Sequence, residues 1–220
     1  CKQLLSITIP EGVASIGKGA FSKCEELTEI SIPTSVSYIG AEAFQLCYKL
    51  TDVTIPEGVT TIEPKTFFNC NSLKRVSIPD SVTTISDNAF SVCPSLTDIT
   101  IPESVTKIGQ GAFGGCKWLK EIAIPEGVTA LYDYTFSGCE RLSTLSLPST
   151  LTSIGSRTFY SCRVLKEVTI PQSVSTIGDS AFAHCQWLEP VHCKSTTPPT
   201  ISDNTFSERA EGLTIYVPKG

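Results

Sequence analysis

A repeat of 23 residues constrains this chain more than any other feature of its sequence. Leucine follows three residues after each repeated cysteine, from Leu4 to Leu188. Phenylalanine keeps the same phase from Phe21 to Phe182, and Phe206 arrives one residue late. A fixed period of this length is typical of a solenoid in which each repeat forms one coil. The repeated cysteines are Cys1, Cys24, Cys47, Cys70, Cys93, Cys116, Cys139, Cys162 and Cys185.

The order of apolar residues inside one coil predicts its local structure. From Leu27 to Ile32 the pattern L-x-x-I-x-I ends in the alternation of a half-buried strand. Pro33 ends this strand, because proline has no N–H for a sheet ladder and favours a tight turn. A second short strand is expected over residues 36–39. The segment A-E-A-F-Q-L-C, residues 41–47, is expected to form one or two helical turns.

These coils are expected to stack into a single α/β solenoid. One coil of this length buries too little apolar surface to offset its ordering entropy, so it folds only against its neighbours. Equivalent residues then lie about 4.8 Å apart, as in adjacent strands, and nine coils span roughly 40 Å of sheet. The unbroken register predicts one domain over residues 1–208.

Composition excludes several classes of partner. The net charge is −5, with both signs interspersed, whereas nucleic acid and anionic membrane surfaces require a basic patch. No apolar run is long enough for a transmembrane helix, so we expect no membrane insertion in this segment. The chain opens at the start of a coil without methionine or a signal peptide, and we interpret it as a fragment.

The motif C-x-x-L-x-x-[IV]-x-I-P-x-x-V-x-x-I-G-x-x-A-F resembles the BspA-like class of leucine-rich repeats over residues 1–208. The resemblance implies a right-handed superhelix of nine coils, each with a strand on the concave face, a short strand on the convex side and a short helical turn. Such repeats occur chiefly in surface and secreted proteins of gut and oral bacteria and of some mucosal protists. The resemblance therefore implies an adhesion module at the cell surface or secreted. We also expect no catalysis and no cofactor, and we favour a monomer.

The implied partner is an extracellular protein or glycan, for which a host matrix protein such as fibronectin is an example. Residues 209–220 resemble the closing element of bacterial members of the class, which continue after Y-V-P into a short helix. We expect Leu213 to Val217 to form a capping strand over the end of the core. The chain stops two residues after Pro218, so this cap is expected to be truncated.

The outward positions of the first strand are the candidate binding residues. On a stacked sheet they form one continuous polar face, and repeat proteins commonly bind partners on such a face. A solvated sheet with serine and threonine chosen for β-propensity is the competing interpretation. The candidate residues on this face are Glu29, Asp52, Lys74, Arg75, Asp98, Lys120, Glu121, Lys166 and Glu167.

The cysteines and histidines present a possible metal or nucleophile site. Stacked cysteines lie close enough for disulfides, but parallel side chains oppose a bridge, so we expect buried free thiols that act as small hydrophobic residues. His184, Cys185, His192 and Cys193 form an H-C-x(6)-H-C pattern. We expect these side chains to project from different parts of the coil, and therefore predict neither a metal site nor a catalytic pair.

Two further surface features have ordinary alternatives. An acidic column follows the prolines, where a cation or basic partner would relieve repulsion, although glutamate at an exposed turn is common. Four aromatic residues are interpreted either as contact anchors for a partner or as side chains that pack on the next coil: Trp118, Trp187, Tyr132 and Tyr134. The column consists of Glu11, Glu57, Asp80, Glu103 and Glu126.

The sequence leaves three functions open. A binding module is the first, and a passive spacer in a larger surface protein is the second. An enzyme is the remote third, because the chain has two histidines and lacks the G-x-S-x-G, H-E-x-x-H and phosphate-loop motifs.

Overall fold

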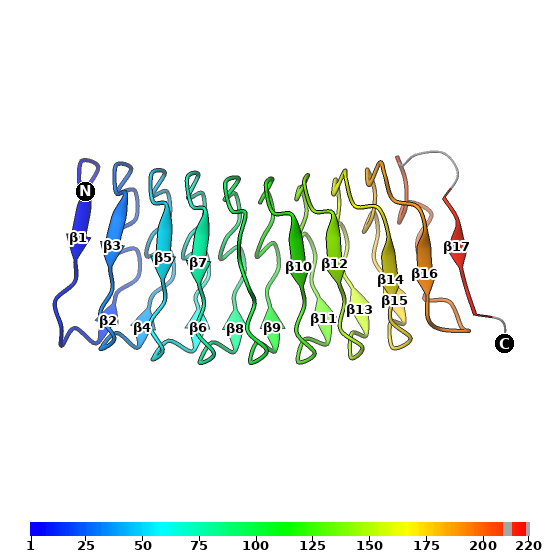
Figure 1. The fold of residues 1–220 in the computed structure, drawn as a ribbon, viewed down its shortest axis with the longest axis horizontal. Helices are drawn as coiled ribbons and strands as arrows, with labels where there is room; N and C mark the ends of the chain where they lie inside the picture. The colour runs from blue at the N-terminus through cyan, green and yellow to red at the C-terminus, as the bar shows by residue number, and fades with distance from the viewer. Residues whose placement is uncertain (209–212, 219–220) are drawn as a thin grey trace.

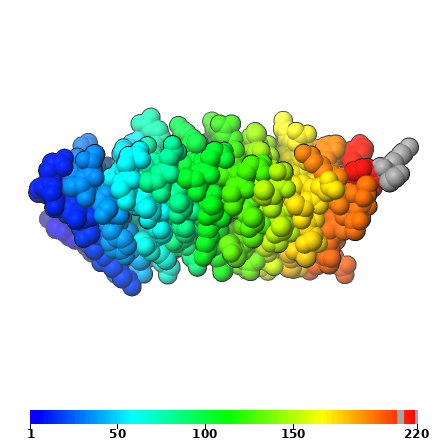
Figure 2. Space-filling view, turned by 90° about the horizontal axis from the view of Figure 1, so that it is seen from below, coloured from blue at the N-terminus to red at the C-terminus, as the bar shows by residue number. Residues whose placement is uncertain are grey.

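The computed structural model describes residues 1–208 and 213–218 and shows a β-solenoid. Its coils follow one another along one long axis, from the N-terminal coil to β17 (Figure 1). The stack runs close to straight in both overall views (Figures 1 and 2). We therefore name its surfaces by their strands and not by curvature.

Each coil contributes to two rows of strands. The first row holds the long strands β1 (Ser6–Thr8), β3 (Glu29–Ser31), β5 (Asp52–Thr54), β7 (Arg75–Ser77), β10 (Glu121–Ala123), β12 (Thr144–Ser146), β14 (Val168–Ile170) and β16 (Val191–Cys193). The second row holds the short strands β2 (Ser15–Ile16), β4 (Tyr38–Ile39), β6 (Thr61–Ile62), β8 (Thr84–Ile85), β9 (Lys107–Ile108), β11 (Ala130–Leu131), β13 (Ser153–Ile154) and β15 (Thr176–Ile177). β17 (Ile215–Tyr216) follows β16 at the end of the first row.

Neighbouring strands pair in parallel at the repeat interval. Ile7 pairs with Ile30 and Val53 with Val76, so equivalent residues stand side by side as the period predicts. The first row is not one continuous ladder, because its strands join as β1–β3, β5–β7, β10–β12 and β14–β16–β17. In the fifth coil the strand is reduced to a single bridge between Arg75 and Asp98.

The prediction of helical turns is wrong. Among the described residues the fold is all-β. In the segment 41–47, the N–H groups of Ala43 and Gln45 donate to carbonyls three residues earlier, at 3.1 Å each. The N–H groups of Glu42, Phe44 and Leu46 instead donate to the next coil, at 2.9–3.0 Å. This alternation replaces the i to i−4 bonds of a helix with single turns tied between coils.

Left-handed backbone conformations explain why no helix forms there. Glu42 and Leu46 have φ of 61° and 62°, and equivalent residues of the other coils repeat these values. A right-handed helix cannot pass through such residues. The A-x-A-F pattern resembles a helical one because its alanine and phenylalanine face the core in either case.

Val92 occupies one of these left-handed positions with φ 57°, where β-branched side chains are strained. Asn69 stands at the same position one coil earlier, and asparagine tolerates this conformation. We expect Val92→Asn to raise the free energy of unfolding by about 1 kcal/mol, measured by urea denaturation. Val92→Ala keeps an L side chain with the same φ and serves as the control. A loss of stability in Val92→Asn would contradict this explanation.

The core consists of columns that run along the solenoid. Phe44 to Phe182 are fully buried, and successive rings stack with centroids 5.2–5.6 Å apart. The leucine column from Leu27 to Leu188 is buried beside them. The prediction that the repeated apolar residues form continuous internal columns is confirmed.

The repeated cysteines are free thiols, as expected, and Cys24 to Cys185 are buried. From Cys47 onward each thiol donates a hydrogen bond to the carbonyl of the phenylalanine 26 residues earlier, as Cys70 does to Phe44 at 3.1 Å. Cys193 pairs with Ile170 and is half-buried. Cys1, in the first coil, is exposed.

The last coil is offset by one residue. Val191 pairs with Val168 at an interval of 23, whereas Thr200 bridges Thr176 at an interval of 24. β17 then pairs with β16, as expected of a last strand within 213–217. The division into a solenoid and a truncated cap at 209–220 stays a prediction, and residues 209–212 and 219–220 lie outside the described part.

Candidate interaction surface

The long-strand face, which we define as the outward positions of the first strand row, is exposed and polar. Within β5, Asp52 and Thr54 are exposed while Val53 between them is buried. The same pattern recurs in β7 and β10. Alternation along each strand thus places one polar row on the surface for every apolar row in the core.

The structure places five of the predicted binding residues on this face and the other four just before its strands. Glu29, Asp52, Arg75 and Glu121 each begin a long strand. Asp98 occupies the same row through its bridge to Arg75. The remaining members precede the strands and are also exposed: Lys74, Lys120, Lys166 and Glu167. Direct pairing joins Asp52 to Arg75 and Arg75 to Asp98, whereas the role of all nine residues in binding stays a prediction.

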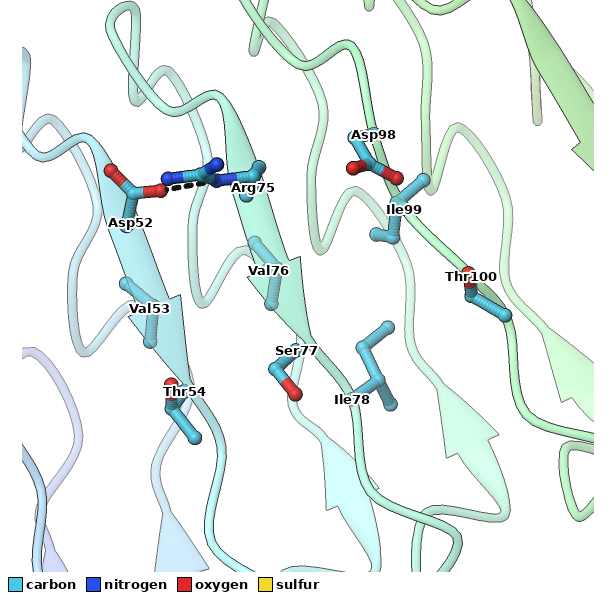
Figure 3. A pocket seen from close by; sticks show the side chains of 10 residues that line it. All are labelled: Asp52, Val53, Thr54, Arg75, Val76, Ser77, Ile78, Asp98, Ile99 and Thr100. Atoms are coloured by element: carbon cyan, nitrogen blue, oxygen red, sulfur yellow. Dashed lines mark hydrogen bonds and ion pairs between the residues drawn. The ribbon is translucent and has the colours of Figure 1, made fainter.

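One ion pair crosses this face between neighbouring coils. Nε of Arg75 donates to Oδ1 of Asp52 at 2.7 Å (Figure 3). This hydrogen bond lowers the pKa of Asp52 below its ordinary value, and Asp52 in turn raises the pKa of Arg75. Because both side chains are exposed, the pair adds little to stability. Asp98 lies on the other side of Arg75, and its charge also raises the pKa of Arg75.

Shallow depressions lie where the long-strand ladder is interrupted. One of about 450 Å³ lies between β5, β7 and residues 98–100 (Figure 3). A second, of about 280 Å³, lies between residues 99–101 and strands β10 and β12, and shares Ile99 and Thr100 with the first. A third, of about 570 Å³, lies between β12 and β14 and reaches Lys194. Together the first two form a trough bordered by Asp98 and Glu121.

The histidines do not meet. The ring of His184 contacts the edge of Tyr160, with centroids 4.8 Å apart. His192 lies in β16 and stacks on Tyr216 at 5.0 Å. Among residues 1–208 and 213–218, no three histidine, cysteine or acidic side chains are grouped so that they could hold a metal ion.

The acidic column at the turns is solvent-exposed. Within it, Glu126 accepts hydrogen bonds from the N–H of Ser149, at 3.0 and 3.1 Å, and from its hydroxyl, at 2.8 Å. These bonds lower the pKa of Glu126. At this position the carboxylate therefore links two neighbouring coils through hydrogen bonds.

Sequence reasoning singled out Tyr134 and Trp118 as possible contact residues but missed the arginines that lie against their rings. Arg157 donates to the hydroxyl of Tyr134 at 3.1 Å, and its guanidinium lies 5.7 and 5.9 Å from the ring centroids of Tyr134 and Tyr160. Arg141 similarly covers the ring of Trp118 at 4.9 Å. The contacts of Arg157 with Tyr134 and of Arg141 with Trp118 join residues one repeat apart, so the 23-residue spacing was the available signal.

The part of the chain that the structure describes contains no helix with the length and apolarity needed to span a bilayer.

The sequence profile of the BspA type leucine rich repeat region, with six copies, matches residues 1–118 and 83–213. These overlapping ranges include nearly all of the chain. No curated protein matches.

Solved structures of bacterial leucine-rich-repeat proteins are similar to this chain. One from Bacteroides ovatus is 31% identical, covers 97% of this chain and 63% of its own, and has a TM-score of 0.76. The chain thus spans less than two thirds of that protein. A leucine rich repeat protein of T. pallidum is 32% identical, with coverage of 84% and 78% and a TM-score of 0.67. A leucine rich cell surface protein of Faecalibacterium prausnitzii is 30% identical, with coverage of 100% and 74% and a TM-score of 0.56.

Proposed function

Because the chain belongs to the BspA-type leucine-rich-repeat family, we propose that it is a non-catalytic module that binds an extracellular protein or glycan through the long-strand face. Repeats of this family generally serve in protein interaction or as structural modules. The observation that carries the proposal is that an exposed charged residue occupies the same position in each coil from Glu29 to Glu121, beside the trough at Asp98 and Glu121.

The carboxylates in this row favour a partner with basic groups. Asp52 is already paired with Arg75, whereas Glu29, Asp98 and Glu121 project from the same row. Charge complementarity of this kind directs encounter and orientation more than it adds affinity. A host matrix protein such as fibronectin is a partner of the proposed class. The proposed state is a monomer. The proposed location, at the cell surface or secreted, is supported by the cell-surface name of the F. prausnitzii relative.

We expect joint replacement of Glu29, Asp52, Asp98 and Glu121 by alanine to weaken binding to immobilised fibronectin at least about tenfold, which corresponds to about 1.4 kcal/mol. Surface plasmon resonance at physiological salt measures this effect. The fold should persist, because all four side chains are exposed.

The matched control removes four exposed acidic residues elsewhere and so changes the net charge equally. It replaces Glu11, Glu57, Asp80 and Asp203 by alanine. An equal loss of binding in both variants would show that overall charge, and not the long-strand face, causes the effect. Unchanged binding in the first variant would favour the alternative, a passive spacer within a larger surface protein.

A further inference from the structure

A separate depression lies on the short strands, away from the long-strand face. It measures about 510 Å³ and extends over β11, β13 and β15 to Thr200. None of its lining residues belongs to the troughs of the long-strand face. The residues that matter for its chemistry are Tyr132, Asp133, Ser153, Thr176, Asp179 and Thr200.

Tyr132 stands at one end of this depression, at a position that is glycine in the neighbouring coils. Gly109 precedes it by one coil, and Gly155 and Gly178 follow. A Cβ atom on Gly155 or Gly178 would lie 2.7 or 2.5 Å from a backbone nitrogen of the preceding coil. The floor beside the tyrosine is therefore bare backbone, and Tyr132 is 46% exposed.

Buried hydroxyls fix the backbone that carries this ring. The carbonyl of Tyr132 accepts hydrogen bonds from the hydroxyls of Thr135, at 2.7 Å, and Thr158, at 3.2 Å. Both threonines are fully buried where Ala112 and Ala181 stand in other coils. A rigid support of this kind lowers the ordering cost of binding. The site is thus pre-organised by side chains that the repeat itself does not require.

Polar rows continue from the ring along the depression. Ser153, Thr176 and Thr200 stand in one row, joined by the pairing of the short strands. Asp133 and Asp179 belong to a neighbouring row that borders the depression. These rows repeat at the coil spacing of about 4.8 Å, which is close to the advance per unit of an extended glycan chain.

We propose that this depression binds a neutral glycan. The exposed face of Tyr132 suits the apolar C–H face of a sugar ring, and the hydroxyl and carboxylate rows suit its hydroxyl groups. Asp133 and Asp179 repel sulfated or uronic-acid chains, and none of the described residues that line the depression is basic. The depression is too shallow to enclose a small molecule, whereas a polymer gains contacts along its length.

Titration with soluble neutral hexasaccharides of glucose, mannose and N-acetylglucosamine tests the proposal, with heparin as the anionic probe. We expect at least one neutral hexasaccharide to bind, and Tyr132→Ala to weaken its binding about tenfold or more. Tyr132→Phe keeps the ring and should retain binding. Isothermal titration calorimetry gives the dissociation constants, and thermal unfolding checks that each variant is folded.

The matched control is Tyr38→Ala, which removes a tyrosine of similar exposure, 48%, from β4 in the same row of short strands. It should not change binding. Thr176→Arg fills the depression without altering Tyr132 and provides a second blocking variant. Binding of no neutral hexasaccharide, equal loss in Tyr38→Ala, or preference for heparin would each overturn the proposal. The four-residue variant of the long-strand face leaves this site intact, so the two proposals fail separately.

Discussion

Replacing Phe113 by alanine is expected to lower the free energy of unfolding by about 3–5 kcal/mol, the range typical of phenylalanine in a closed core. The ring is fully buried and lies 5.3 Å from the rings of both Phe90 and Phe136. Its removal leaves a cavity between two coils that depend on each other for burial. Because coils interact only with neighbours, we also expect unfolding to split or broaden at this point.

Urea denaturation followed by circular dichroism measures both effects. Phe21→Ala is the matched control, since Phe21 belongs to the same column but is half-buried and stacks on Phe44 from the first coil. We expect a smaller loss there. A loss below about 1 kcal/mol in Phe113→Ala would show that this column does not hold the coils together.

The buried thiols predict steep unfolding at alkaline pH. Burial raises the pKa of Cys47, Cys93, Cys139 and Cys185 to about 12. Burial together with repulsion from adjacent cysteines also raises the pKa of Cys70, Cys116 and Cys162 well above its ordinary value. In the unfolded chain these thiols have a pKa of about 8.5. Above that pH the unfolded chain releases protons that the folded protein still holds.

The sign of the effect follows from this difference in bound protons. Stability is fully present below about pH 8.5 and falls as pH rises, by about 1.4 kcal/mol per pH unit for each thiol. The seven thiols together give on the order of 10 kcal/mol per pH unit. We therefore expect cooperative unfolding between about pH 9 and about pH 12, before the folded thiols ionise.

A pH titration monitored by circular dichroism measures this transition. Cys93→Ala combined with Cys116→Ala should make the transition shallower by about two protons, because each thiol contributes one. At neutral pH a thiol reagent should modify Cys1, and Cys193 in part, while the buried column stays unmodified until the protein unfolds. A stable fold above about pH 12, or rapid modification of the buried thiols at neutral pH, would contradict the assigned burial.

The repeat interval was sufficient to predict the stacking and the core. Any residue that recurs at a fixed interval must meet its own copy in the next coil, so the columns of Leu27, Phe44 and Cys47 could be assigned from the spacing alone. The same argument placed Asp52 beside Arg75 on the outer face. Which outer face binds a partner does not follow from this geometry, because serine, threonine and charged residues also suit a solvated sheet.

The helical turns were predicted wrongly because the spacing of core-facing residues does not indicate whether the backbone takes right-handed or left-handed φ values. Glu42 and Leu46 are ordinary helix-forming residues by type, yet both adopt positive φ. Hydrogen bonds to the following coil stabilise this conformation over the local preference. Contacts between coils therefore override the helix propensity of these residues. Such contacts cannot be inferred from the sequence of a single segment.

The positions at which the long-strand ladder is interrupted could also not be predicted from the sequence. Coil five carries the same I-x-I pattern as its neighbours at Ile99 and Ile101, but only Asp98 forms a bridge. Because the troughs lie at these interruptions, their positions could not be derived from the repeat alone.

The one-residue offset of the last coil bears on how proteins of this kind change in length. Within the stack the strand pairs join equivalent positions, so gaining or losing a single residue would misalign all later columns. The offset occurs after Cys193, where one neighbour remains to be matched. Evolution can therefore lengthen or shorten the middle of such a molecule only by entire coils. Each such step extends or shortens the long-strand face by one coil, without altering its local chemistry.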